Sequence, residues 1–92
     1  LLALAGKSDA QAQVAGLIMG FAQAASDSPC HPAQKFELPL SRADCANMLG
    51  LTIETVSRQI TKLRDAGVIN LPGGRAITIA DRPALIRRAE AA

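Results

Sequence analysis

The segment SRADCANMLGLTIETVSRQITKLRDAG, residues 41 to 67, predicts two helices joined by a tight turn. Ser41 is a favoured N-cap residue, and Asp44 three positions later completes a capping box. Gly50 is expected to end the first helix, because glycine adopts the left-handed conformation at low cost. Thr52 is the N-cap of the second helix, which continues to the glycine that closes the segment.

The second helix, expected over residues 53–66, has two different faces. Four apolar residues recur at the spacing of one helical face and predict a stripe that packs against a core: Ile53, Val56, Ile60 and Leu63. Five polar residues occupy the opposite face: Glu54, Ser57, Arg58, Thr61 and Asp65. That polar face is expected to be solvated or to contact a polar ligand.

A short helix, a turn with a glycine and a second helix with a polar outer face are typical of a DNA-binding helix-turn-helix. The N-terminal residues of the second helix then lie in the major groove. There Glu54 can accept from cytosine N4, Arg58 can pair with guanine O6 and N7, and Ser57 is adaptable. The alternative is an ordinary i, i+4 ion pair between Glu54 and Arg58 on a solvated face, worth about 0.2–0.5 kcal/mol.

The run LSRADCANMLGLTIETVSRQITKLRDAGVI, residues 40–69, resembles the DNA-binding domain of the Crp/Fnr transcription regulators, in the branch that includes the Fnr and FixK proteins. That branch carries E-x-x-S-R in its recognition helix, matched here by Glu54, Ser57 and Arg58. The cyclic-AMP receptor branch instead has an arginine where this chain has Ile53, and a glycine in place of Ser57. The resemblance covers nearly the whole chain and is weaker toward the N-terminus.

The resemblance implies a winged helix-turn-helix over residues 9–92, mainly α-helical with a small β-sheet. It implies that residues 1–8 are the end of a dimerisation helix or a linker, the alternative being an apolar terminus packed on its own domain. The implied target is a TTGAT half-site, with Arg58 on the guanine and Glu54 on a cytosine of the opposite strand. The full-length regulator is implied to be a bacterial homodimer that binds palindromic double-stranded DNA.

The remaining segments fit this architecture. Residues 9–25 predict a helix whose inward face carries Val14, Leu17, Ile18 and Phe21. Glycines at positions 16 and 20 would allow another helix to approach closely. Residues 36–40 alternate as a short edge strand, and residues 68–71 and 75–79 form a hairpin, the wing, around Pro72–Gly74. Asp81 then caps a final helix, which faces either a preceding sensor domain or solvent.

Five basic or hydroxylic residues are predicted to hold DNA phosphates: Arg42, Thr52, Thr55, Lys62 and Arg75. By resemblance, all of them except Lys62 match phosphate-contacting positions in the family, and Lys62 lies toward the side of the polar face. The formal net charge is only +2, but residues 51–92 hold seven basic and four acidic groups. Residues 1–50 hold three basic and four acidic groups. This basic excess indicates either a phosphate footprint or an ordinary soluble surface.

No cofactor is expected in this chain. Cys30 and Cys45 form no CxxC motif, and His31 lacks further ligands for zinc, so both thiols are expected to be reduced and structural. In the family, an effector or iron-sulfur cluster belongs to an N-terminal sensor domain that precedes this part. Short, interrupted apolar runs predict no membrane span and a cytoplasmic protein.

An enzyme and a protein-binding winged helix are the two alternatives to DNA binding. An enzyme is disfavoured because the only histidine lies in a proline-flanked loop with no evident catalytic partner. A winged helix that binds protein is the stronger rival, although the polar helix face offers only arginine as an interface anchor. The loop of residues 26–35 is either a plain connection or, by resemblance, a contact for RNA polymerase.

Overall fold

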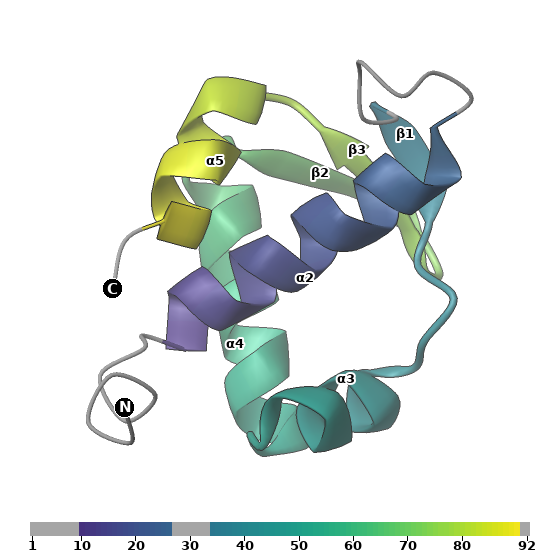
Figure 1. Cartoon of the computed structure of the whole chain (residues 1–92), viewed down its shortest axis with the longest axis vertical. Coiled ribbons are helices and arrows are strands. Elements are labelled where there is room, and N and C mark those ends of the chain that lie inside the picture. The colour runs from purple at the N-terminus through teal and green to yellow at the C-terminus, as the bar shows by residue number, and fades with distance from the viewer. Residues whose placement is uncertain (1–9, 27–33, 91–92) are drawn as a thin grey trace.

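Helix α2 (Ala10–Ala25) begins the part of the chain that the computed structural model describes, which comprises residues 10–26 and 34–90. The other elements follow in this order: β1 (Lys35–Glu37), α3 (Arg42–Leu49), α4 (Ile53–Asp65), β2 (Ile69–Gly73), β3 (Ala76–Ile79) and α5 (Arg82–Glu90). Figure 1 shows α2 lying across α4, with α5 beside the N-terminal end of α2 and β1 near its other end. The predicted class, mainly α with a small sheet, is confirmed.

The turn between α3 and α4 forms as the sequence predicted. The Ser41 hydroxyl accepts a hydrogen bond from the Asp44 backbone N–H at 3.1 Å and caps α3. Gly50 adopts φ 70°, and the Leu51 N–H donates to the Ala46 carbonyl at 2.8 Å, as in a Schellman motif. The chain therefore leaves α3 and enters α4 through three residues, with the left-handed glycine fixing the angle.

The C-terminal end of α4 uses the same device. The helix ends at Asp65, slightly before the predicted boundary, and Gly67 adopts φ 78°. The Val68 N–H then donates to the Leu63 carbonyl at 3.0 Å. Because both ends of α4 are satisfied locally, the helix is held as a defined unit of 13 residues.

The sheet has the strand order β1-β3-β2, and all pairs are antiparallel. The predicted edge strand forms as β1, but it spans Lys35–Glu37 instead of residues 36–40. Phe36 and Leu38 are buried, and Leu40 is only partly buried. In the hairpin, a register shift between Asn70 and Gly73 extends β2 beyond its predicted end. Pro72 lies in this irregular stretch, where a strand tolerates a missing N–H donor.

The core is mainly aliphatic, with Phe36 and Cys45 among its members, and lies between the helices and the sheet. Its largest fully buried side chains come from every layer: Ile18, Leu38, Leu63, Ile69, Ile77 and Leu85. From the predicted stripe of α4, Val56, Ile60 and Leu63 are buried, but the prediction for Ile53 is wrong, since 51% of it is exposed. In Figure 1 the N-terminal turn of α4 lies beside α3, away from the crossing with α2. The apolar spacing of α4 therefore extends one turn beyond the part of the helix that packs in the core.

The inward face of α2 differs in part from the prediction. Val14 and Ile18 are buried, whereas Leu17 and Phe21 are only partly buried, because three alanines take the core positions: Ala12, Ala15 and Ala22. No heavy atom lies within 4 Å of a Cβ built on Gly16 or Gly20, so no helix in the described residues approaches them. Leu17 and Phe21 instead line, with the glycines and Ala24, an apolar hollow of about 280 Å³.

The final helix packs against α2. The Asp81 carboxylate accepts from the Ala84 N–H at 3.1 Å, which confirms the predicted cap. Arg88 Nη1 donates to Gln11 Oε1 at 3.2 Å and ties the last turn of α5 to the first turn of α2. The predictions for residues 1–8 and for Cys30 and His31 lie outside the described residues.

Candidate nucleic-acid interface

The polar face of α4 is presented to solvent. Glu54, Arg58 and Thr61 are exposed, and Ser57 is half-buried between them and the body of the domain. Within residues 10–26 and 34–90, the one ion pair joins Arg64 to Asp65, at 3.2 Å. Glu54 and Arg58 do not pair with each other there, so both charged groups are accessible to a ligand.

The N-terminus of α4 is capped by two threonines in direct contact. Thr52 Oγ1 accepts from the Thr55 N–H at 3.1 Å and donates to Thr55 Oγ1 at 2.8 Å. Each hydroxyl has one proton, and the bond between the two oxygens uses one of the two protons. Only the Thr55 hydroxyl proton therefore remains free to bind an anion. Two separate phosphate contacts by Thr52 and Thr55 would need two free hydroxyl donors.

The other predicted phosphate-binding residues lie on three different elements. Arg42 is the first residue of α3 and is half-buried, and Arg75 lies in the turn of the wing with its side chain exposed. Lys62 is exposed in the last turn of α4, about 15 Å along the helix axis from Thr52 at 1.5 Å per residue. The structure thus brings the two threonines into contact and places the three cations on separate elements.

The wing turn is held in place by the segment after β1. The Leu38 N–H donates to the Arg75 carbonyl at 2.9 Å, and Leu38 itself is buried. Gly74 in the turn has φ 56°, in the left-handed region. Arg75 therefore extends from a fixed backbone, which can position its guanidinium for a phosphate.

Ile53 belongs to this surface, although the sequence assigned it to the core. It is the first residue of α4, directly before Glu54 and one helical turn before Ser57. The sequence did contain a signal for its exposure, namely its position immediately after the N-cap Thr52. A residue in the first turn of a helix is buried only if the core extends to that end of the helix.

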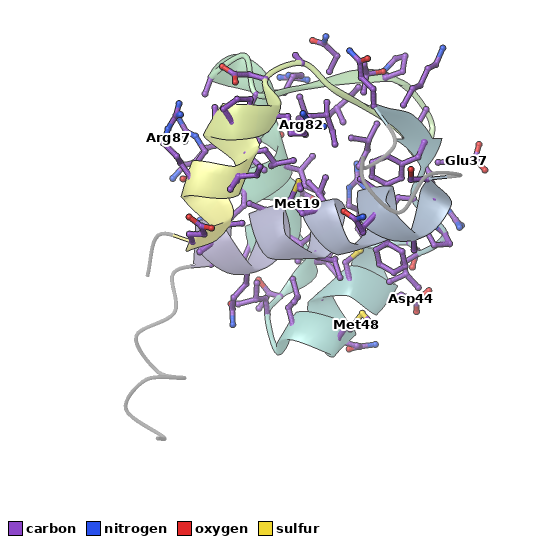
Figure 2. All side chains as sticks on the ribbon, turned by 45° about the horizontal axis from the view of Figure 1, so that its top comes forward. Met19, Glu37, Asp44, Met48, Arg82 and Arg87 are labelled. Carbon is purple, nitrogen blue, oxygen red and sulfur yellow. The ribbon has the colours of Figure 1, made fainter. Side chains whose placement is uncertain are left out.

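Outside this face, the described surface carries the apolar hollow on α2 and arginines on α5. Figure 2 shows Arg82 and Arg87 on α5, on the opposite side of the molecule from Asp44 and Met48 on α3. The residues that the structure describes contain no cluster of three or more metal-ligating side chains. Cys45 is fully buried in α3, and desolvation raises the pKa of its thiol. No described helix combines the length and apolar character needed to cross a membrane.

The family model of the Crp-like helix-turn-helix domain matches residues 12–88. The chain belongs to this family. The Crp-like match covers both helices of the turn, the wing and most of α2 and α5. The predicted resemblance to the Crp/Fnr regulators is therefore confirmed, and the fold is their winged helix-turn-helix.

Relatives within the family include the nitrogen fixation regulation protein FixK of Azorhizobium caulinodans, 40% identical over 86 residues that cover 94% of this chain and 35% of the relative. The transcriptional activator protein FnrL of Cereibacter sphaeroides is 48% identical over 54 residues, which cover 59% of this chain and 22% of FnrL. The solved structure of FixK2 from Bradyrhizobium japonicum superposes with a TM-score of 0.82 and 32% identity, covering 99% of this chain and 43% of FixK2. This Crp-like chain thus spans less than half the length of these relatives.

Proposed function

We propose that this domain binds double-stranded DNA in a sequence-specific manner, as the DNA-binding part of a bacterial transcription regulator, with the N-terminal half of α4 in the major groove. The observation that carries the proposal is the exposed face of α4, where Glu54 and Arg58 are accessible and unpaired with each other at a capped helix end. Such a face is where helix-turn-helix proteins contact base edges. Relatives described as a transcriptional activator and as regulators of nitrogen fixation support the same role.

Glu54, Ser57 and Arg58 form the proposed base-reading set. Arg58 donates two hydrogen bonds to guanine O6 and N7, and Glu54 accepts from the N4 amino group of a cytosine on the opposite strand. The half-buried Ser57 has a short side chain, which lets the groove floor approach the helix between them. The proposed half-site is TTGAT, the sequence implied by the E-x-x-S-R pattern.

Phosphate contacts are proposed to position the helix. Arg42 and Arg75 approach the backbone from α3 and from the wing, and Lys62 does so from the far end of α4. Thr52 and Thr55 contribute a single hydroxyl donor together, beside the exposed N–H groups of the helix end, where anions are favoured.

The complete regulator is proposed to be a cytoplasmic homodimer on a palindrome, with two copies of α4 about 34 Å apart, one turn of DNA. The contact of residues 26–35 with RNA polymerase remains part of this proposal. No cofactor is proposed for this domain, and any effector would act through the remainder of the regulator.

Fluorescence anisotropy with labelled duplexes tests the proposal. The 92-residue chain is titrated into a palindrome of TTGAT half-sites and into a scrambled duplex of the same composition, across several salt concentrations. Three phosphate-binding cations per chain predict that log K falls with log[salt] with a slope of about −3 per bound chain. We expect tighter binding to the palindrome at every salt concentration.

Equal, salt-dependent binding to both duplexes would support a DNA-binding function and would reject TTGAT as the half-site. Absence of binding to either duplex, repeated with two domains joined by an artificial dimerisation segment, would favour the rival function of a protein-binding winged helix.

A further inference from the structure

Helix α2 carries an apolar hollow on the side that the core does not use. Its volume is about 280 Å³, and its lining consists of Gly16, Leu17, Gly20, Phe21 and Ala24. Both glycines and Ala24 are exposed, and no heavy atom lies within 4 Å of a Cβ built on either glycine. The described residues therefore leave this apolar surface uncovered.

The chemistry of the hollow restricts what can fill it. Helix α2 has no charged residue, and none of the five lining residues has a polar side-chain atom. A phosphate or a charged peptide would find no partner there. Leu17 and Phe21 are only partly buried, so covering them with aliphatic side chains removes further apolar surface from water. The fitting occupant is an uncharged segment with aliphatic side chains.

The residues directly before α2 have this composition. Residues 1–6, LLALAG, carry no charge and contain three leucines. They lie outside the described residues, and only three further residues separate them from Ala10, where α2 begins. Because this segment is covalently joined to the helix, its effective concentration at the hollow exceeds that of any separate molecule present in trace amounts.

We propose that residues 1–6 fold back along α2 and fill this hollow. Leu4 then lies over Gly16, and Leu2 lies over Gly20. This arrangement is the apolar terminus packed on its own domain that the sequence left open. The inference is separate from the proposed function, because the hollow lies on α2 and the DNA contact is assigned to α4.

The chain is long enough for both contacts. At 1.5 Å per residue, Gly16 lies about 9 Å along the helix axis from Ala10, and Gly20 lies about 15 Å from it. In extended chain at about 3.3 Å per residue, the six residues back to Leu4 span about 20 Å, and the eight residues back to Leu2 span about 26 Å. The excess length allows the segment to leave the helix end and reverse its direction.

The spacing of the leucines also matches that of the glycines. Leu2 and Leu4 are two positions apart, so in extended chain they lie on the same side, about 6.6 Å from each other. Gly16 and Gly20 are four positions apart on the helix, which is about 6 Å along its axis. Ala3 would lie on the opposite side of the segment, away from α2.

NMR spectroscopy of the 92-residue chain tests the contact, because the chain has two phenylalanines and neither tyrosine nor tryptophan. Phe36 is buried in the core, with 8% of it exposed, whereas Phe21 lines the hollow. We expect nuclear Overhauser effects (NOEs) from the methyl groups of Leu2 and Leu4 to the ring of Phe21, and none to the ring of Phe36. In a mixture of 13C-labelled and unlabelled chains, isotope-filtered spectra should show no such NOE between chains.

A double variant with Leu2→Ser and Leu4→Ser is compared with Ala3→Ser as the matched control. The double variant should lose the methyl NOEs to Phe21 and should shift the Phe21 ring resonances. Ala3→Ser should retain both the NOEs and the ring shifts, because its side chain lies on the other side of the segment. Thermal unfolding verifies that both variants remain folded, and anisotropy with the palindrome should give the same Kd for both.

Three results would overturn the inference. NOEs between labelled and unlabelled chains would assign the hollow to a second copy of the domain. Absence of NOEs from Leu2 and Leu4 to Phe21, with ring shifts that the double variant leaves unchanged, would show that the segment does not occupy the hollow. Methyl NOEs to Phe21 that persist in the double variant would assign the contact to other residues. In each case the proposed DNA-binding function would be unaffected.

Discussion

Arg58 and Arg75 have exposed side chains of the same charge on different elements, α4 and the wing turn. We expect Arg58→Ala to weaken binding to the TTGAT palindrome by about 1–3 kcal/mol and to remove the preference for guanine, because the bidentate contact is lost. Arg75→Ala should weaken specific and random duplexes nearly equally, because a phosphate contact carries no sequence information. Anisotropy titrations with the palindrome, with a guanine-substituted palindrome and with random DNA measure both effects.

Arg82→Ala is the matched control for these two variants, since Arg82 is an exposed arginine on α5. It should bind all three duplexes almost as the unaltered chain does. Equal losses for Arg58→Ala and Arg75→Ala on every duplex would contradict the separate roles that we assign to them.

Burial of Cys45 gives the domain a pH dependence at alkaline pH. Desolvation raises the pKa of the thiol, the Arg42 charge opposes this rise, and the Asp44 charge adds to it. In the unfolded chain a cysteine thiol has a pKa of about 8.5, and in the folded domain the pKa of Cys45 is higher. The protonated thiol therefore contributes fully to the free energy of unfolding below about pH 8.5, and this contribution is lost as pH rises through the pKa of the folded state. The free energy of unfolding should therefore decrease with pH above this value more steeply for the unaltered chain than for Cys45→Ala. Parallel curves in urea titrations would show that the thiol does not contribute.

Single residues were predictable where a local rule determines them. Ser41, Thr52 and Asp81 cap their helices as the sequence indicated, because an N-cap needs only a side-chain oxygen and the next few residues. Ile53 was not predictable from period alone, since its burial depends on where the neighbouring elements end. The hydrogen bond from Thr52 Oγ1 to Thr55 Oγ1 was also not predicted, because it depends on rotamers that the sequence does not specify.

At the scale of elements, glycine has opposite effects in a helix and at its end. Gly16 lies within α2, and Gly50 ends α3 with φ 70°, yet each has open space for a Cβ. Gly16→Ala should therefore stabilise the domain by up to about 1 kcal/mol through helix propensity. Gly50→Ala should destabilise it by about 1–2 kcal/mol, because an L-residue is strained in the left-handed region. Thermal and urea unfolding of the two variants measure the difference.

A loss of stability in Gly16→Ala would indicate that the glycine has a role beyond helix propensity, for example in the apolar hollow that it lines. A neutral Gly50→Ala would show that the turn between α3 and α4 relaxes, contrary to its defined hydrogen bonds.

Helix positions were predicted more accurately than strand boundaries or the rotation of α2. The capped ends of α3 and α4 have explicit signals, whereas the register shift in the wing depends on how β2 and β3 pair, which the sequence does not determine locally. On α2, which has no charged residue, alanines and larger apolar residues lie on all sides. The spacing of apolar residues therefore does not identify which face of α2 is buried. The contacts of α2 with α4 and α5 determine that face.

At the scale of the whole molecule, the proposed interface is assembled from segments that are separate in sequence. Arg42 begins α3, the proposed base-reading set lies on α4, and Arg75 lies in the turn of the wing, whose strand β3 pairs with β1. The helix-turn-helix and its family were recognisable because their motif is contiguous. The relation of the wing to α4 required tertiary packing, and the half-site remains a prediction from the family pattern.

Chemical shift mapping by NMR tests the central claim most directly, because it locates the DNA on the surface of this domain. Amide spectra of the 15N-labelled 92-residue chain are recorded while the TTGAT duplex is added, with the scrambled duplex as a control. We predict that the largest changes occur at the N-terminal half of α4, from Thr52 to Arg58, and at the wing turn near Arg75, and that α5 and the exposed side of α2 change little. Largest changes on α2 or α5, with α4 unaffected, would contradict the placement of α4 in the major groove.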